Sequence, residues 1–222
     1  DRAGIYTYDV LAATQPDDLE QAAGRLTDDA RVRDYTSVRT ENVSAGFGGT
    51  TETVQLVVVP DGFSLDDYIN LRGDDGSTLE LADATSDGGV LVTKSLANLT
   101  GLVAGDEVSL QDTSLSRGSA KVDGIVMNYL GDAVYMTQSA YEATFGKELE
   151  ANALLAHLNG TTDEKIAFAD ELSADTTWLS VVSTQAAVRD FSNVFLLISC
   201  VTVLLTVLAA GLSFVVLLTL ST

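Results

Sequence analysis

The chain contains a single histidine, His157, and this residue limits the catalytic chemistry that the sequence can support. A Ser-His-Asp triad needs a histidine held by a carboxylate beside a nucleophile, and a histidine-based metal site needs more than one imidazole. His157 lies in a run with a strand-like pattern, and no recognisable nucleophile motif accompanies it. The sequence therefore predicts a structural histidine, no catalytic residue and no histidine-based metal site.

Two other groups of residues have the composition of binding motifs but not their spacing. The run Gly46-Phe47-Gly48-Gly49 lacks the Lys-Ser/Thr pair and the following helix of a phosphate-binding loop, so it predicts a hairpin turn. The pairs Asp66-Asp67 and Asp74-Asp75 lack the alternating oxygens and distal glutamate of a calcium-binding loop, which favours turn residues. We expect no cofactor and no metal ion.

The charge of the chain is strongly negative and unevenly distributed. The sequence has 32 Asp and Glu against 12 Lys and Arg, a formal net charge of -20, and all of these residues lie within residues 1–190. Such a region is repelled by nucleic acid, and its shortage of Lys and Arg fits the non-cytoplasmic side of a membrane. The one cysteine, Cys200, permits no intrachain disulfide. We therefore expect residues 1–190 to be extracytoplasmic and stabilised by packing.

The C-terminal residues 191–222 contain no charged side chain, and residues 195–220 are almost wholly apolar. At about 1.5 Å per residue this apolar run spans roughly 39 Å as a helix, which exceeds the roughly 30 Å hydrocarbon core of a bilayer. A buried helix of a soluble protein would need protein around all its faces, and the rest of the chain is too polar to provide it. We predict one transmembrane helix over residues 191–222.

Small and hydroxyl side chains recur through this segment, mostly at steps of three, four and seven residues. They are Ser192, Ser199, Thr202, Thr206, Ala209, Ala210 and Ser213. A face of this kind favours packing against other transmembrane helices. Alternatively, the hydroxyl groups bond back to carbonyl groups of their own helix.

Two stretches far apart in the sequence show the same order of strand, helix and strand. The first predicts a strand at 4–14, a helix capped by Thr14, and strands at 35–44 and 51–59. The second predicts a strand at 151–158, a helix at 162–172 and a strand at 178–183, with Thr161 and Glu164 as a capping box. This repetition suggests the two βαβ halves of a ferredoxin-like, porter-type α/β sandwich in the α+β class.

The stretch between these halves is rich in turns and short strands. It predicts strands at 90–92 and 107–110 with a short helix at 94–99 between them. We interpret residues 64–117 as an inserted small β-rich subdomain. Strands at 121–127 and 133–136 and a helix capped by Thr137 then return the chain to the main sandwich, which comprises residues 1–63 and 118–190.

Three segments of the sequence resemble one family of membrane proteins. Residues 89–97 with 101–110 are similar to a recurrent segment in the extracytoplasmic domains of FtsX-like and MacB-like ABC transporter permeases. Residues 122–137 resemble a stretch that precedes a transmembrane helix in large bacterial members, and residues 214–222 resemble the end of that helix. The resemblance implies a porter-like α/β part, an inserted β-rich part and a flanking helix of a permease in a bacterial cell membrane.

The resemblance also implies a function without enzymatic activity. Members of the family couple ATP hydrolysis by a separate ABC ATP-binding protein to conformational change outside the cell membrane, in export or mechanotransmission. Expected partners are this ATPase, other transmembrane helices of the same permease, and an extracytoplasmic protein or a peptide or lipid substrate. Two other interpretations remain open: a membrane-anchored binding or adhesion ectodomain with a single span, and an anchored hydrolase, which the missing catalytic residues disfavour.

Overall fold

The chain folds as a mixed α+β protein in which one long sheet supports several short helices. A computed structural model describes residues 6–86, 88–127, 131–189, 202 and 206. The elements are β1 (Val10–Ala13), η2 (Pro16–Asp18), α1 (Leu19–Thr27), β2 (Val32–Phe47), β3 (Thr50–Val59), β4 (Leu71–Arg72), β5 (Thr78–Leu79), α2 (Leu81–Ala84), β6 (Gly89–Thr93), α3 (Lys94–Thr100), β7 (Glu107–Gln111), β8 (Arg117–Val126), β9 (Ala133–Thr137), α4 (Gln138–Phe145), β10 (Ala153–Leu158), α5 (Thr162–Ala174) and β11 (Ser180–Ser183). Nine of these strands pair in the order β11-β1-β10-β2-β3-β9-β6-β8-β7.

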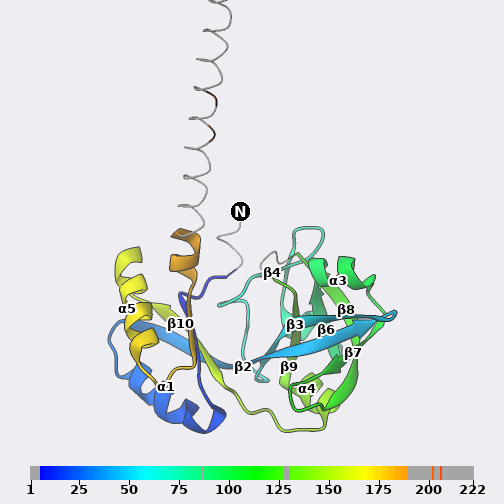
Figure 1. Ribbon diagram of the computed structural model, residues 1–222, viewed down its shortest axis with the longest axis horizontal. Helices are drawn as coiled ribbons and strands as arrows, with labels where there is room; N and C mark the ends of the chain where they lie inside the picture. Colours follow the sequence, from blue (N-terminus) through cyan, green and yellow to red (C-terminus); the bar gives the residue numbers. More distant parts are fainter. Residues whose placement is uncertain (1–5, 87, 128–130, 190–201, 203–205, 207–222) are drawn as a thin grey trace, which may run out of the picture. The chain divides into compact units, whose positions relative to one another are not determined.

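One end of the sheet is a four-stranded antiparallel layer, which we call the sheet lobe. Its strands pair in the order β11-β1-β10-β2, with α1 connecting β1 to β2 and α5 connecting β10 to β11. The two helices lie on the same side of this layer (Figure 1). Val10 and Leu154 of the strands pack with Phe168 of α5 in one buried cluster. Alternate residues of each strand therefore face the helices, as the period of a half-covered strand requires.

The other end of the sheet closes on itself, and we call it the ring lobe. Six strands, β2, β3, β9, β6, β8 and β7, form the ring, because β7 also pairs with β2 at Gln111↔Ser44. Val43, Leu56 and Met136 are among the buried residues of its core. Tyr141 of α4 belongs to the same cluster. Each of the six strands thus has a hydrogen-bonded neighbour on both sides.

Strand β2 belongs to both lobes. Its first part pairs with β10, as in Ala153↔Val38, and its second part pairs with β3, beginning at Arg39↔Val58. A separate buried cluster contains Val38 and Leu155 of the sheet lobe together with Tyr135 of the ring lobe. Strand β2 thus runs through both lobes (Figure 1), and a common hydrophobic core also joins them.

The strands at the two ends of the sequence lie side by side, as predicted. β1 pairs with β10 at Val10↔Ala156 and Leu11↔Leu155. The two caps predicted from local sequence are also present: the hydroxyl of Thr137 accepts from the N–H of Ala140, and the α5 capping box forms. Thr14 does not cap a helix; its hydroxyl donates to the carbonyl of Thr177 at 2.7 Å.

The strand pairing divides the chain differently from the boundaries expected at residues 64 and 117. Strands β6 and β7 fall inside that range, yet they pair with β8, β9 and β2, which lie outside it. The reason is burial: all five residues of β6 are buried, so this strand needs covered faces and a partner on each edge. Residues 89–111 are therefore part of the ring lobe, whose other strands were assigned to the main sandwich.

By its contacts the chain divides into residues 1–184 and residues 185–222. The transmembrane helix predicted over residues 191–222 lies outside the described residues, apart from Thr202 and Thr206. Among the residues that the structure describes, no helix combines the length and apolar character needed to cross a membrane. The hydroxyl of Thr206 donates to the carbonyl of Thr202, four residues earlier, at 2.8 Å, which is the back-bonding considered above as the alternative.

Candidate functional site

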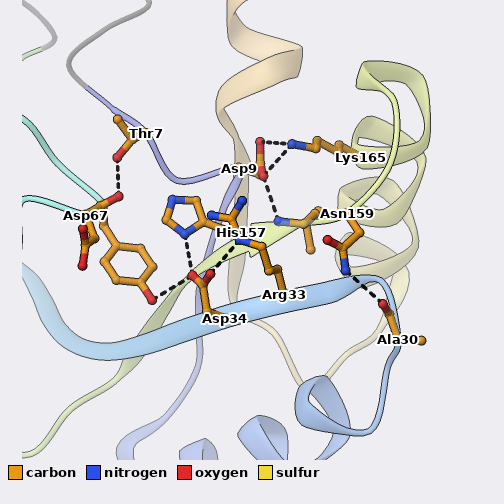
Figure 2. Close-up of polar contacts among 11 residues, drawn as sticks. Thr7, Asp9, Ala30, Arg33, Asp34, Asp67, His157, Asn159 and Lys165 are labelled. Carbon is orange, nitrogen blue, oxygen red and sulfur yellow. Dashed lines mark hydrogen bonds and ion pairs between the residues drawn. The ribbon is translucent and has the colours of Figure 1, made fainter.

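Polar side chains gather where β10 ends beside β1 and β2, and the histidine lies at their centre (Figure 2). His157 Nδ1 is 2.5 Å from Oδ1 of Asp34, a β2 residue. The ring of Tyr68 stacks on the imidazole with 4.7 Å between centroids, and its hydroxyl donates to the same Asp34 oxygen at 3.1 Å. The His157 side chain is only 10% exposed. The histidine thus braces β10 against β2 and against the segment that contains Tyr68.

The carboxylate of Asp34 is charged, and hydrogen bonds compensate for its partial burial. Burial alone would raise the pKa of this carboxyl, but hydrogen bonds from Arg33, His157 and Tyr68 outweigh it and lower the pKa below its usual value. The bond from Nε of Arg33 is 2.8 Å long. Because the Asp34 side chain is 43% exposed, solvent screens these contacts. They therefore fix the local geometry and contribute little to the stability of the fold.

A second carboxylate, Asp9, lies next to this group and is more deeply buried. Its side chain is 6% exposed, and both its oxygens accept from Nζ of Lys165, at 3.0 and 2.9 Å. The Asp9 carboxylate also accepts from the backbone N–H of Leu158 at 2.8 Å. The side chain of Asp9, just before β1, therefore holds the end of β10 and the first half of α5. We call Asp9, Asp34, Tyr68, His157 and Lys165 the junction cluster.

The chain leaves the sheet lobe beside this cluster. Strand β11 ends at Ser183, and residues 184–189 are helical with no intervening loop. The N–H of Thr184 donates to the carbonyl of Asp9 at 3.0 Å. Burial raises the pKa of the Tyr8 phenol, and the Thr184 side chain partly offsets this rise. Thr184 is thus attached to Asp9, the residue before β1.

The chemistry available to the junction cluster is ion pairing and hydrogen bonding. Nδ1 of His157 is committed to Asp34, and the ammonium group of Lys165 is committed to Asp9. Within the described ranges, no group of three or more His, Cys, Asp or Glu side chains is arranged to hold a metal ion. The arrangement holds strands and helices together at the place where the chain leaves the fold.

Other motifs considered from sequence lie apart from this cluster. Gly48 and Gly49 have φ of 59° and 89° and form the turn between β2 and β3, as predicted. Asp75 forms a turn by accepting from the N–H of Ser77 at 2.9 Å. Asp66 has no hydrogen-bond partner for Oδ1, and burial together with neighbouring carboxylates raises its pKa. Asp75 is thus a turn residue, as predicted.

Sequence reasoning named His157 but not its partners. Asp34 is 123 residues away from His157, and Lys165 is 156 residues away from Asp9. No local spacing encodes such pairs. One signal was available: Asp9 is a carboxylate inside a run predicted to be a strand, where a buried charge requires a partner.

No protein-family model matches the chain, and no curated protein matches it. Three solved structures are similar in fold. The periplasmic region of MacB from Actinobacillus actinomycetemcomitans is 12% identical, with a TM-score of 0.46, and the match covers 86% of this chain and 95% of that chain. The extracellular domain of the noncanonic ABC-type transporter YknZ from Gram-positive bacteria is 11% identical, with a TM-score of 0.44 and coverage of 79% and 99%. A domain of a permease protein from Porphyromonas gingivalis is 10% identical, with a TM-score of 0.34 and coverage of 82% and 89%.

Proposed function

We propose that residues 1–190 are the extracytoplasmic domain of an FtsX/MacB-type ABC transporter permease and that residues 191–222 are one of its transmembrane helices. The domain would receive the movement driven by ATP hydrolysis in a separate cytoplasmic subunit and transmit it outside the membrane. The uncharged C-terminal segment and the family-like segments at 89–110, 122–137 and 214–222 support this assignment.

The observation that carries the proposal is the direct passage from β11 into a helix. Residues 184–189 contain neither Gly nor Pro, and they are helical immediately after the strand. A flexible tether would let a helix tilt without moving the strand before it, whereas a direct junction opposes independent movement. Thr184 adds to this coupling because its N–H donates to the carbonyl of Asp9, the residue before β1.

The topology of the sheet lobe supports a finer assignment of its fold. Two split β-α-β units interleave in the strand order β11-β1-β10-β2, and every neighbouring pair is antiparallel. We infer a ferredoxin-like, porter-type sandwich for this lobe. In such a sheet the strand that leads to the helix is directly bonded to a central strand.

The proposal is tested by inserting Gly-Gly-Ser between Ala187 and Val188 in the full-length permease with its ATPase. We expect ATP hydrolysis to remain measurable while the permease no longer complements a strain that lacks it, because the insert breaks the helix. A matched control carries the same insert between Gly62 and Phe63, in an exposed loop, and should complement normally. If the Ala187–Val188 insertion also complemented fully, mechanical transmission would be refuted and a tethered binding domain favoured.

A further inference from the structure

A groove of about 550 Å³ crosses the outer face of the ring lobe where β2 meets β7. Its volume falls within the roughly 300–1,000 Å³ of pockets that hold small ligands. Six side chains with polar groups line it: Ser44, Thr51, Ser109, Gln111, Arg117 and Ser119. These residues have no role in the transmission proposed above.

The register of the strands places these side chains on one surface. Across one row, Gly46 lies opposite Thr51 of β3 and Ser109 of β7, and Ser109 lies opposite Ser119 of β8. In the neighbouring row Gln111 lies opposite Ser44 and Arg117. The residues between the rows, such as Ala45 and Leu110, are buried in the ring core. Hydroxyl groups from four strands thus form a single outward face.

Gly46 makes the groove possible. A Cβ atom at this position would lie 2.7 Å from the Oγ of Ser109, which itself donates to the carbonyl of Gly46 at 3.0 Å. The φ of Gly46 is not in the left-handed region, so its backbone would accept other residues. The glycine therefore makes room for the Ser109 hydroxyl, and a side chain at this position would displace it and enter the groove.

The charge of the groove is opposite to that of the chain. Arg117 is exposed and has no ion pair among the described residues, whereas Lys147, Lys165 and Arg39 are all paired with carboxylates. None of the groove-lining residues is Asp or Glu. The next outward pair along the strands is Glu107 opposite Lys121. A free guanidinium in a carboxylate-free groove is a suitable site for a carboxylate ligand.

Two properties of the groove determine what kind of ligand molecule carries that carboxylate. The strands beneath it are paired on both edges, so no free backbone edge is available to bind an extended peptide. Leu110 is the one large apolar residue that lines the groove, and it is 1% exposed. The groove therefore offers no pocket for an apolar side chain of a ligand. What remains are hydroxyl groups, which both donate and accept hydrogen bonds, and one guanidinium. This combination matches a sugar that carries an acid group.

We propose that this groove binds an oligosaccharide containing uronic acid, in which Arg117 pairs with the sugar carboxylate and the serine and threonine hydroxyls bond to ring hydroxyls. A ligand with one charge per sugar suits the groove better than a polyphosphate, since the net charge of -20 repels a ligand more strongly as its negative charge grows. The site is independent of the transport proposal, because its residues were identified from the ring lobe alone.

The test uses the full chain in detergent and measures binding of tetragalacturonate by calorimetry. The fully methyl-esterified oligosaccharide is the neutral control, and soluble oligomers of glycerol phosphate and vesicles containing anionic phospholipid test the two sources of phosphate. The main variant is Arg117→Gln. Its matched control is Arg72→Gln, which makes the same change at another exposed arginine without an ion pair among the described residues.

We expect Arg117→Gln to weaken tetragalacturonate binding by about tenfold or more, as loss of a charge-assisted hydrogen bond does, and Arg72→Gln to leave it unchanged. Gly46→Val should also abolish binding while the thermal unfolding midpoint shows a folded protein, and Ser119→Ala should weaken it without affecting folding. The proposal is overturned if the wild-type chain does not bind tetragalacturonate, if the methyl ester binds equally well, or if Arg117→Gln binds normally. Preferential binding of glycerol phosphate oligomers or of vesicles would also overturn it.

Discussion

Replacing Lys165 by Met should strongly destabilise the sheet lobe, because it leaves a buried carboxylate without its ammonium partner. The substitution keeps much of the aliphatic side chain but leaves the Asp9 carboxylate, 6% exposed, without the ammonium group that contacts both its oxygens. Removing one partner of a buried pair costs about 3–5 kcal/mol. Because the Lys165 side chain is 20% exposed and water reaches part of the site, we expect the lower end of that range, about 3 kcal/mol.

The chain has a built-in probe for this measurement. Trp178 is its single tryptophan, is 8% exposed, and packs in the same cluster as Val10 and Phe168. Its fluorescence should therefore report unfolding of the sheet lobe in urea. A loss of about 3 kcal/mol corresponds to a fall in Tm of roughly 6–12 °C for a domain of this size.

The control is Arg25→Met, which removes an exposed ion pair to Asp175. The two side chains of that pair are 58% and 39% exposed, so this change should cost no more than about 1 kcal/mol. In the double variant of Asp9→Asn with Lys165→Met, the loss should be smaller than the sum of the two single losses, because both remove the same contact. Equal losses for Lys165→Met and Arg25→Met would refute the reasoning.

Four further outcomes are expected. Burial would raise the pKa of the Asp112 carboxyl, but hydrogen bonds from Lys147 and the Ser116 backbone lower it below its usual value. A carboxyl with a lowered folded-state pKa stabilises the protein above its unfolded-state pKa, so Asp112→Asn should lower the free energy of unfolding at pH 7. In urea titrations, the difference in this free energy between Asp112→Asn and wild type should shrink as the pH falls below about 4. Leu115 has a φ of 66° and is 74% exposed, so Leu115→Asn should raise the unfolding free energy, by about 0.5–1 kcal/mol; a lower value would contradict the strain. Raising NaCl from about 0.1 to 1 M should raise Tm, because it shortens the screening length among the 32 acidic side chains; an unchanged Tm would show that their repulsion is small. An impermeant maleimide should label Asp18→Cys, made in a Cys200→Ser background, on intact cells, and labelling after lysis alone would place residues 1–190 in the cytoplasm.

Features that depend on neighbouring residues could be predicted from the sequence. The cap of α4 needs only Thr137 and the N–H of Ala140, and the α5 capping box needs only Thr161 and Glu164. The β2–β3 hairpin follows from a glycine turn between two strand-like runs. Each of these is specified by a few consecutive residues, whose side chains compete directly for local backbone groups.

Ring closure could not be predicted in this way. It depends on β2 pairing with β7, for example Gly46 with Ser109, two positions that no local pattern links. Both strands alternate between buried and exposed residues, which is consistent with any sheet that covers one face. The same limit applies to the junction cluster, since Asp34 and His157 meet only after β10 has paired with β2. Local sequence specified the elements, and long-range pairing created both proposed sites.

Strand β2 connects the junction cluster to the groove. Its residues 32–38 pair with β10, which pairs with β1, and Asp9 just before β1 accepts a hydrogen bond from the N–H of Thr184. Its residues Ser44 and Gly46 line the groove. No turn or break separates these parts of the strand, and the cluster around Val38 and Tyr135 fills the space between the lobes. A movement that enters through the helix would therefore carry the groove with the sheet, because a close-packed core resists relative sliding of the lobes. If the domain transmits movement as proposed above, a bound saccharide would be displaced as a whole with it, and its affinity would stay the same.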